Sequence, residues 1–281
     1  MSVAASDVPT ESVPDALSAH GLTVRFGGIS ALTNVSLRVP RQTIVGLVGP
    51  NGAGKSTAFA VLSGLLKPNA GTVELGGVDV SKASPQVRAK RGLARTFQQP
   101  EMFLGLNVRE HLLLADRVRH AHSRLWRDAF TGGALRQESA VEAARIDAWL
   151  ELLGLASAGD RRVDSLPLGT TRLVEVARAL AKEPTVLLLD EPFSGLNPHE
   201  ADALMVALAR TAVDHGVAML LVEHDVPRVL SIAARIFVLD FGEIIAEGTS
   251  AEIRNDPTVR AAYLGDDLVE YEAMTPPGRE S

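Results

Sequence analysis

The strongest chemical signal in the sequence is Gly-Pro-Asn-Gly-Ala-Gly-Lys-Ser-Thr at positions 49–57, which fits the pattern G-x-x-x-x-G-K-[ST]. Glycines allow the backbone to wrap closely around phosphate oxygens, and the amide groups and positive end of a following helix attract the anion. We expect Lys55 to bridge the terminal phosphates and Ser56 to offer its hydroxyl to Mg²⁺. The predicted phosphate site comprises Gly49, Asn51, Gly52, Ala53, Gly54, Lys55, Ser56 and Thr57.

Two further apolar runs end in polar residues that suit phosphate chemistry. Residues 185–189 are typical of a strand buried on both faces, and Asp190 and Glu191 follow directly. Asp190 can hold Mg²⁺ through water, and Glu191 can orient or deprotonate the attacking water. The run at 217–222 is followed by Glu223, His224 and Asp225. A lone histidine is more often structural, but beside a phosphate loop His224 is a candidate γ-phosphate contact.

Gln98 and Gly169 are weaker candidates, because only their predicted places at a strand end and a helix start suggest a role. Gln98 follows a β-type run that Pro100 interrupts, so its amide could reach a metal or water near bound phosphate. Gly169 precedes a helix predicted from apolar residues recurring through Leu180, and a helix start can hold an anion. A bare glutamine is usually a surface residue, and most helix starts bind only water or a cap.

The elements that must position these residues begin with a predicted antiparallel pair. Leu22, Val24 and Phe26 alternate with polar residues, as do residues 35–39, and Gly27-Gly28 separates the two runs. An exposed aromatic on such a sheet could stack on a nucleotide base, but the spacing alone favours a core position for Phe26. Residues 72–75 and 78–80 predict a short hairpin.

The predicted strands around the phosphate loop are followed by a helical stretch between Pro100 and Leu166. Cap patterns at Asn107 and Ser139, each with glutamate three residues later, predict two helix starts. An all-helical insert inside an α/β chain indicates a lobe that can move.

Composition excludes several classes of protein. The chain has 281 residues, no cysteine and a formal net charge of −6. It therefore has no disulfide framework and no thiolate metal site, and the dispersed Lys and Arg residues argue against a nucleic-acid-binding face. We expect neither a signal peptide nor a transmembrane helix, because no apolar run reaches about 18 residues.

Taken in chain order, these motifs resemble those of an ABC transporter ATP-binding subunit. The resemblance covers roughly residues 18–265 and implies an α/β fold: a P-loop NTPase core with an antiparallel β subdomain and an inserted α-helical subdomain at about 100–165. We expect residues 1–17 to form a disordered leader and 266–281 an acidic flexible tail. The matching segments are Gly49 to Thr57, Gln98, Leu166 to Thr170, Leu189 to Pro192, Ser194 to Asn197 and His224.

The resemblance implies an ATPase that uses ATP and Mg²⁺. In that light Phe26 stacks on adenine, and the Gly169 helix of one subunit meets ATP bound to the other in a two-subunit clamp. The implied catalytic residues are Glu191, His224 and Gln98, and the implied metal contacts are Ser56, Gln98 and Asp190.

The implied partners are transmembrane permease subunits, a second ATP-binding subunit in a homodimer or heterodimer and, indirectly, a solute-binding protein, with no nucleic acid. The chain would work peripherally on the cytoplasmic face of the membrane. We expect a permease to dock near Gln98 to Leu106, where Pro100, Met102, Phe103 and Leu104 form an apolar stretch, although folding back into the core is nearly as plausible.

Shorter strings resemble the branched-chain amino-acid transporter subgroup, and the helical insert resembles the larger of its two ATPases. These strings are residues 25–28, 95–98, 195–198, 254–257 and 262–265. The signature departs from the family's Leu-Ser-Gly-Gly-Gln, because Pro167, Leu168 and Thr170 replace the serine, the first glycine and the glutamine. One hydroxyl contact to phosphate is therefore missing, and slow hydrolysis is expected.

The alternative function is a soluble ABC-type regulator or DNA-repair ATPase that moves no solute. Translation-type relatives usually carry two ATPase units, and repair-type relatives carry long heptad insertions, neither of which this sequence shows. A P-loop kinase would leave Gly169, Glu191 and His224 without roles.

Overall fold

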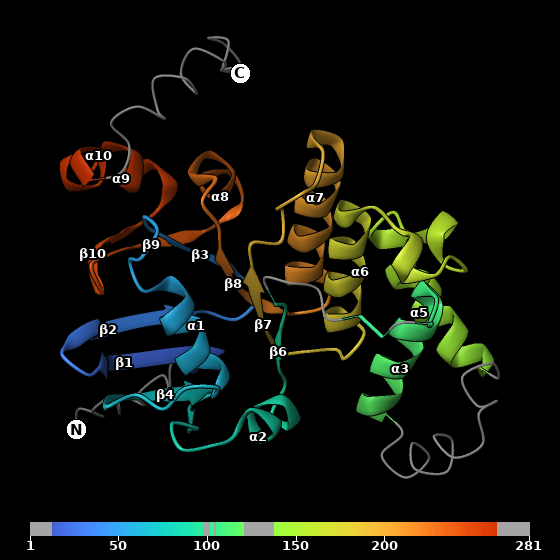
Figure 1. The fold of residues 1–281 in the computed structure, drawn as a ribbon, viewed down its shortest axis with the longest axis horizontal. Coiled ribbons are helices and arrows are strands. Elements are labelled where there is room, and N and C mark those ends of the chain that lie inside the picture. Colours follow the sequence, from blue (N-terminus) through green and yellow to red (C-terminus); the bar gives the residue numbers. More distant parts are fainter. Residues whose placement is uncertain (1–12, 98–101, 104, 121–137, 263–281) are drawn as a thin grey trace, which may run out of the picture.

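The computed structural model describes residues 13–97, 102, 103, 105–120 and 138–262 of the chain. Two β-sheets and a group of helices make up this part, and Figure 1 shows the helical lobe to one side of the sheets. The predictions for residues 1–12, Gln98, Pro100, Leu104 and 263–281 lie outside the described residues.

The larger sheet has six strands in the order β10-β9-β3-β8-β7-β6. All of its neighbouring strands are parallel except the antiparallel pair β9 and β10. Parallel strands bring their carboxyl ends to one edge, so the segments that follow them lie together. The strands are β3 (Ile44–Val48), β6 (Leu93–Arg95), β7 (Val186–Asp190), β8 (Ala218–Val222), β9 (Arg235–Asp240) and β10 (Glu243–Gly248).

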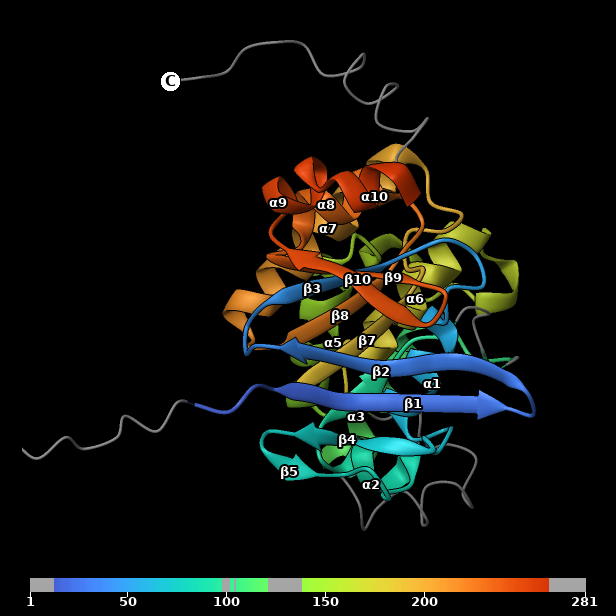
Figure 2. The same ribbon diagram turned by 90° about the vertical axis from the view of Figure 1, so that its left-hand side faces the viewer.

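The smaller sheet is antiparallel, in the order β2-β1-β4-β5, and lies on the side of the molecule shown in Figure 2. Helix α1 (Lys55–Ser63) shares one buried cluster with this sheet and with the inner face of the larger one. The predicted α/β fold with an antiparallel β subdomain is confirmed. The strands are β1 (Leu17–Phe26), β2 (Ile29–Val39), β4 (Ala70–Leu75) and β5 (Val78–Asp79).

The boundary that we expected between leader and domain, after residue 17, is too late. Ala16 and Leu17 are buried, β1 begins at Leu17, and the amide of Ala16 donates a hydrogen bond to the carbonyl of Val39. The domain therefore starts before the strand alternation becomes visible in the sequence.

The helical lobe contains the predicted helices and their caps. Ser139 and Glu142 form a capping box at the start of α5, and Asn107 and Glu110 exchange the same pair of bonds before α3. Ile146, Trp149 and Leu150 form a buried face of α5. The lobe contains α3 (Val108–His120), α5 (Ala140–Leu152), η2 (Ala156–Ala158), η3 (Val163–Ser165) and α6 (Leu168–Leu180), and the remaining helices are α2 (Pro85–Lys90), α7 (Pro198–Asp214), α8 (Val226–Ile232), α9 (Ser250–Asn255) and α10 (Pro257–Ala262).

Candidate functional site

The phosphate loop connects β3 to α1 and packs tightly against neighbouring backbone. A Cβ on Gly49 would lie 2.0 Å from the carbonyl oxygen of Leu239, and one on Gly54 would lie 2.6 Å from that of Ala31. Gly54 also has a φ of 108°, which side chains other than glycine rarely adopt. These two positions require glycine, so the loop's shape is set by its contacts with β9 and β2.

Helix α1 begins without a side-chain cap, because its N-cap residue is Gly54. The Lys55 ammonium donates hydrogen bonds to the carbonyl oxygens of Gly49 and, at 2.9 Å, Pro50. Burial lowers the pKa of Lys55, while the nearby carboxylates of Glu191 and Asp190 oppose that shift. The loop therefore holds a partly desolvated cation and an open helix start beside two carboxylates, and a phosphate group would complement the cation and the helix start.

Asp190, the last residue of β7, is buried at the sheet edge. Its amide donates to the Thr96 hydroxyl at 3.0 Å, and its Oδ2 pairs with Arg95 Nη2 at 3.0 Å. In the sequence, Arg95 and Thr96 belong only to one of the subgroup strings, and no sequence signal indicates Asp190 as their partner.

Glu191 and His224 meet across the edge as their positions after β7 and β8 predict. His224 Nε2 lies 3.2 Å from Glu191 Oε2. The backbone of Glu191 has a φ of 49°, and its amide donates to the carbonyl of Val222 at 2.9 Å. A residue held in this sparsely populated conformation beside a phosphate loop is consistent with a functional constraint on its side chain.

Two buried glutamates, whose roles the sequence did not reveal, hold the loops beside these residues. Glu223 Oε1 accepts a hydrogen bond from the amide of Phe193 at 2.9 Å, and Glu175 Oε1 accepts one from the amide of Phe97 at 2.6 Å. Burial raises the pKa of both carboxyl groups. Arg172 completes the second contact, because its Nη1 donates to the carbonyl of Phe97 at 2.7 Å. Both backbone groups of Phe97 are thus held by α6, next to the segment that contains Gln98.

Gly169 lies in the first turn of α6, whose N-cap Pro167 offers no side-chain cap. Its nearest neighbours belong to the segment before α7 and to the first turn of that helix: a Cβ would lie 2.8 Å from the carbonyl oxygen of Gly195 and 3.0 Å from Glu200 Oε2. In Figure 1, α1 and α6 lie on either side of β7. A second helix start without a side-chain cap is therefore present, separate from the chain's own phosphate loop.

Phe26 is 53% exposed at the end of β1, so the core position that its spacing favoured is wrong. Residues 25–30, which form the tip of the β1-β2 hairpin, are all exposed. The strand pair therefore extends beyond the core that covers Leu22 and Val24. Phe26 is accessible to a ligand, as the family resemblance requires.

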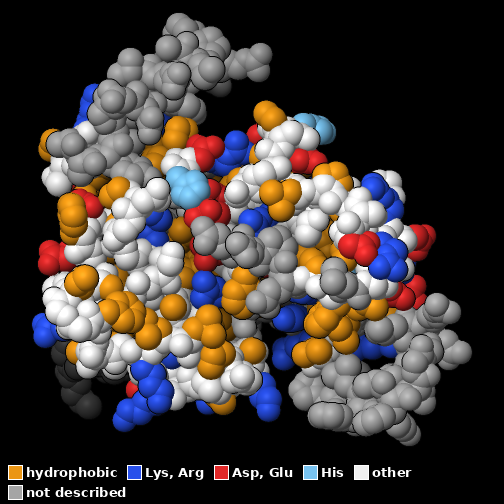
Figure 3. Space-filling view, viewed as in Figure 1, with side chains coloured by type: hydrophobic (Ala, Val, Ile, Leu, Met, Phe, Trp, Pro, Cys, Tyr) orange, Lys and Arg blue, Asp and Glu red, His pale blue; other side chains and the backbone are white. Residues whose placement is uncertain are grey.

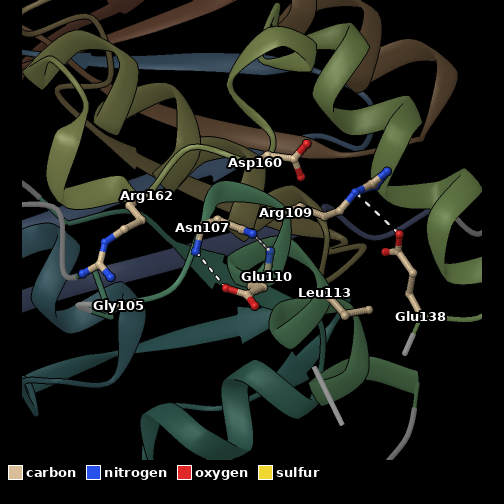
Figure 4. Close-up of a pocket in the computed structure, with 8 residues that line it drawn as sticks. All are labelled: Gly105, Asn107, Arg109, Glu110, Leu113, Glu138, Asp160 and Arg162. Atoms are coloured by element: carbon tan, nitrogen blue, oxygen red, sulfur yellow. Dashed lines mark hydrogen bonds and ion pairs between the residues drawn. The ribbon is translucent and has the colours of Figure 1, made fainter. Parts of the chain in front are cut away.

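A cavity of about 410 Å³ opens at the start of α3 (Figure 4). It is lined by Gly105, Asn107, Arg109, Glu110, Leu113, Glu138, Asp160 and Arg162.

The stretch before α3 contains part of the predicted permease-docking site. The amide of Phe103 donates a hydrogen bond to His111 Nε2 at 3.0 Å and the Phe103 ring is exposed, whereas Met102 packs against the core. The apolar stretch expected to receive a permease is thus partly folded into the domain.

Over the described ranges, no helix combines the length and apolar character that crossing a bilayer needs. The same ranges contain no cluster of three or more His, Asp or Glu residues arranged to hold a metal. On the face in Figure 3, basic side chains are dispersed among acidic and apolar ones, and a histidine lies beside acidic groups near the middle.

Two family models match the chain. Residues 32–194 match the ABC transporter model, and residues 243–269 match a model described as branched-chain amino acid ATP-binding cassette transporter. Over 254 residues, the chain is 40% identical to the high-affinity branched-chain amino acid transport ATP-binding protein LivG of Salmonella typhimurium, covering 89% of this chain and 98% of LivG. It is 37% identical to BraF of Pseudomonas aeruginosa, named in the same way, with the same two coverages.

Solved structures agree with this assignment. The ADP conformation of MJ1267, an ATP-binding cassette of an ABC transporter, matches 90% of this chain with a TM-score of 0.77 and 30% sequence identity. A nucleotide-free ATP-binding cassette from an ABC transporter matches 94% of it with a TM-score of 0.72 and 27% identity. The chain therefore belongs to the ABC transporter family, as one of its ATP-binding, ATP-hydrolysing members.

Proposed function

We propose that the chain is the ATP-hydrolysing subunit of a transporter that imports branched-chain amino acids. The observation that carries this proposal is the 40% identity to LivG over nearly the whole of that protein. The match of residues 243–269 to the branched-chain subgroup model also supports it. The alternative of a soluble regulatory or repair ATPase receives no support from LivG or BraF, whose names describe transport.

Bound ATP would place its phosphates at the loop of Gly49 to Thr57 and its adenine against the exposed ring of Phe26. The donor set fits Mg²⁺, because the Asp190 carboxylate and the Ser56 hydroxyl are hard oxygen ligands and Mg²⁺ usually takes few protein ligands beside phosphate. Gln98 is the third proposed contact. When bound, the metal neutralises charge on the phosphates.

Hydrolysis at this site would depend on Glu191 and His224. Glu191 orients the attacking water and accepts its proton, and His224, 3.2 Å away, fixes that carboxylate and reaches the γ-phosphate. Lys55 leaves its carbonyl partners for the terminal phosphates. Burial of its ammonium strengthens that interaction, since the cation is already partly desolvated.

Two subunits would close on two ATP molecules, with the α6 start of each facing the phosphates bound by the other. Gly169 and the open helix start supply amides and the helix dipole. Pro167 supplies no hydroxyl, and Leu168 and Thr170 differ from the family's usual residues, so turnover is expected to be slow. Closure depends on the γ-phosphate, which distinguishes ATP from ADP.

The permease subunits would dock on the cytoplasmic face, between the α/β core and the helical lobe near Gln98 to Leu106. Gln98 would couple nucleotide state to the lobe, since the backbone of Phe97 is tied to α6 by Glu175 and Arg172. The solute-binding protein would act indirectly, through the permease.

The chemical step is tested with Glu191→Gln. The variant should lose ATP turnover, keep ATP binding and accumulate the closed dimer. Glu243→Gln, which changes an exposed carboxylate on β10, is the matched control and should keep the parent rate. A Glu191→Gln protein that hydrolyses ATP as fast as the parent would remove Glu191 from this role.

The transport assignment is tested by co-expressing the chain with its adjacent permease genes and isolating membranes. Binding protein loaded with a branched-chain amino acid should stimulate the ATPase of the parent and fail to stimulate Gln98→Ala. Full stimulation of the variant would exclude the coupling role. A parent chain that associates with no permease would favour the soluble regulator.

A further inference from the structure

Arg95, at the end of β6, makes a set of contacts that the proposed reaction leaves unexplained. Its side chain is only 14% exposed, and its guanidinium lies over the rings of Phe59 and Phe97, 5.6 and 5.3 Å from their centres. Nη1 donates to the Ser63 hydroxyl at 3.0 Å, and Nε to the carbonyl of Thr96 at 3.3 Å. These contacts fix the plane of the guanidinium, which makes Arg95 a rigid group.

The remaining nitrogen, Nη2, pairs with Oδ2 of Asp190 at 3.0 Å. Among the described residues, Oδ1 of the same carboxylate accepts no hydrogen bond. The terminal torsion of an aspartate is broad, so a carboxylate without a fixed partner samples many orientations. Holding Oδ2 against a rigid guanidinium therefore fixes the direction of Oδ1.

We propose that Arg95 is a positioning residue for Asp190: it holds one carboxylate oxygen so that the other is oriented for the divalent cation that accompanies ATP. This inference rests on the proposed function of the site. Ligands of metals usually need such outer partners, and their loss typically weakens metal binding. Lysine cannot substitute fully, because it lacks the planar fork that both stacks and donates in fixed directions.

The opposite role would be competition, in which Arg95 occupies the carboxylate until the metal displaces it. Competition needs a guanidinium that can leave, whereas this one is held by Ser63, Thr96 and two aromatic rings. The two roles predict opposite changes in metal affinity when Arg95 is replaced. Removing a positioning residue weakens metal binding, and removing a competitor strengthens it.

The test measures Mn²⁺ binding to the ATP complex by electron paramagnetic resonance, in the Glu191→Gln background so that ATP persists. Arg95→Met removes the charge and the fork but keeps an apolar chain. We expect its Mn²⁺ affinity to fall by about tenfold and that of Arg95→Lys by a smaller factor. ATP affinity in EDTA should stay within about twofold of the parent, because the phosphate loop is unchanged.

Arg88→Met is the matched control. Arg88 is also buried and also bonds α1, through the carbonyl oxygens of Val61 and Leu62, but it does not contact Asp190. This variant should lose stability, seen in thermal unfolding, and keep the parent's Mn²⁺ affinity. If Arg95→Met does not fold, Arg95→Lys carries the same comparison.

Four outcomes would overturn the proposal. Unchanged Mn²⁺ affinity without Arg95 would show that Asp190 needs no such partner, and tighter Mn²⁺ binding would establish competition. Equal losses in the Arg88 and Arg95 variants would show a general effect of destabilisation. A parent protein that binds neither ATP nor Mn²⁺ with ATP would overturn the proposed function, and the positioning role with it.

Discussion

Helices α1 and α7 both begin near the candidate site, yet their first turns are built in opposite ways. The start of α7 is closed: Asn197 and Glu200 form a capping box in which each side chain accepts from the other's amide at 3.0 Å. The start of α1 has no side-chain cap, and α6 shares that property. Capping consumes the amide donors that an anion would otherwise use.

The difference shows that neighbouring helices of one chain can serve different purposes at their starts, one folding stability and the other ligand binding. The capped helix needs no ligand and adds to folding stability, whereas the uncapped starts leave backbone donors for phosphate at some cost in stability. The contact between Gly169 and the loop before α7 joins the two kinds of helix start directly. If the two kinds of start act separately despite this contact, changes at the uncapped starts should alter ATP binding or turnover, and changes at the capped start should alter only folding stability.

The largest effect is expected at the start of α1. Gly54→Ala places a methyl group 2.6 Å from the carbonyl of Ala31 in a conformation that alanine rarely adopts. The free energy of unfolding should fall by about 1–3 kcal/mol, and ATP affinity by more than about tenfold. Urea unfolding and ATP titration measure the two changes. Gly159→Ala, where a Cβ meets nothing closer than 3.5 Å, should change neither.

Next in size is Gly169→Ala at the start of α6. The added Cβ would approach Gly195 and Glu200, so the loop before α7 must shift. ATP binding by the isolated subunit should stay at the parent level, because the phosphate loop of the same chain is untouched. Steady-state ATP turnover should fall by about tenfold, since the clamp requires this helix start. Unchanged turnover would contradict the role of α6 in the clamp.

A smaller effect is expected from opening the closed start of α7. Asn197→Ala should lower the free energy of unfolding by about 1 kcal/mol, the usual contribution of an N-cap side chain. ATP affinity should not change. Ser139→Ala at the capping box of α5 should cost a similar amount and serves as a distant comparison. A loss of ATP affinity in Asn197→Ala alone would break the separation between the two kinds of helix start.

The smallest effect concerns pH and the cap of α5. The hydrogen bond from Arg117 lowers the pKa of Glu142 from an ordinary value of 4.5 to about 2. A lowered carboxyl pKa gives stabilisation that is complete above pH 4.5 and is lost as the pH falls toward 2. Glu142→Gln should therefore show a shallower loss of stability across this range, measured by circular dichroism. Glu151 is exposed on the same helix, so the stability of Glu151→Gln should depend on pH as that of the parent does.

Much of the site could be predicted because its chemistry follows strand ends. The phosphate loop, Asp190, Glu191 and His224 each begin within two residues of the end of a buried apolar run, and parallel strands must deliver such residues to one edge. Periodicity also predicted the buried face of α6. These signals are local, so one sequence is sufficient to read them.

The parts that could not be predicted depend on contacts between distant residues. Nothing in the sequence near Arg95 indicates that its partner is Asp190, and the same holds for Glu175 with Phe97 and Glu223 with Phe193. Phe26 was misplaced because alternation predicts the face of a strand but not where the core under that face ends, and residues 25–30 at the hairpin tip are all exposed. The resemblance to the family corrected that prediction, which spacing alone could not.

The two hydrogen bonds to Phe97 have a mechanical consequence. A segment attached at one point can swivel, so it transmits a pull but no torque. Phe97 is attached to α6 at both its amide, by Glu175, and its carbonyl, by Arg172. With two points of attachment, a rotation of α6 must rotate the backbone of Phe97 as well as displace it.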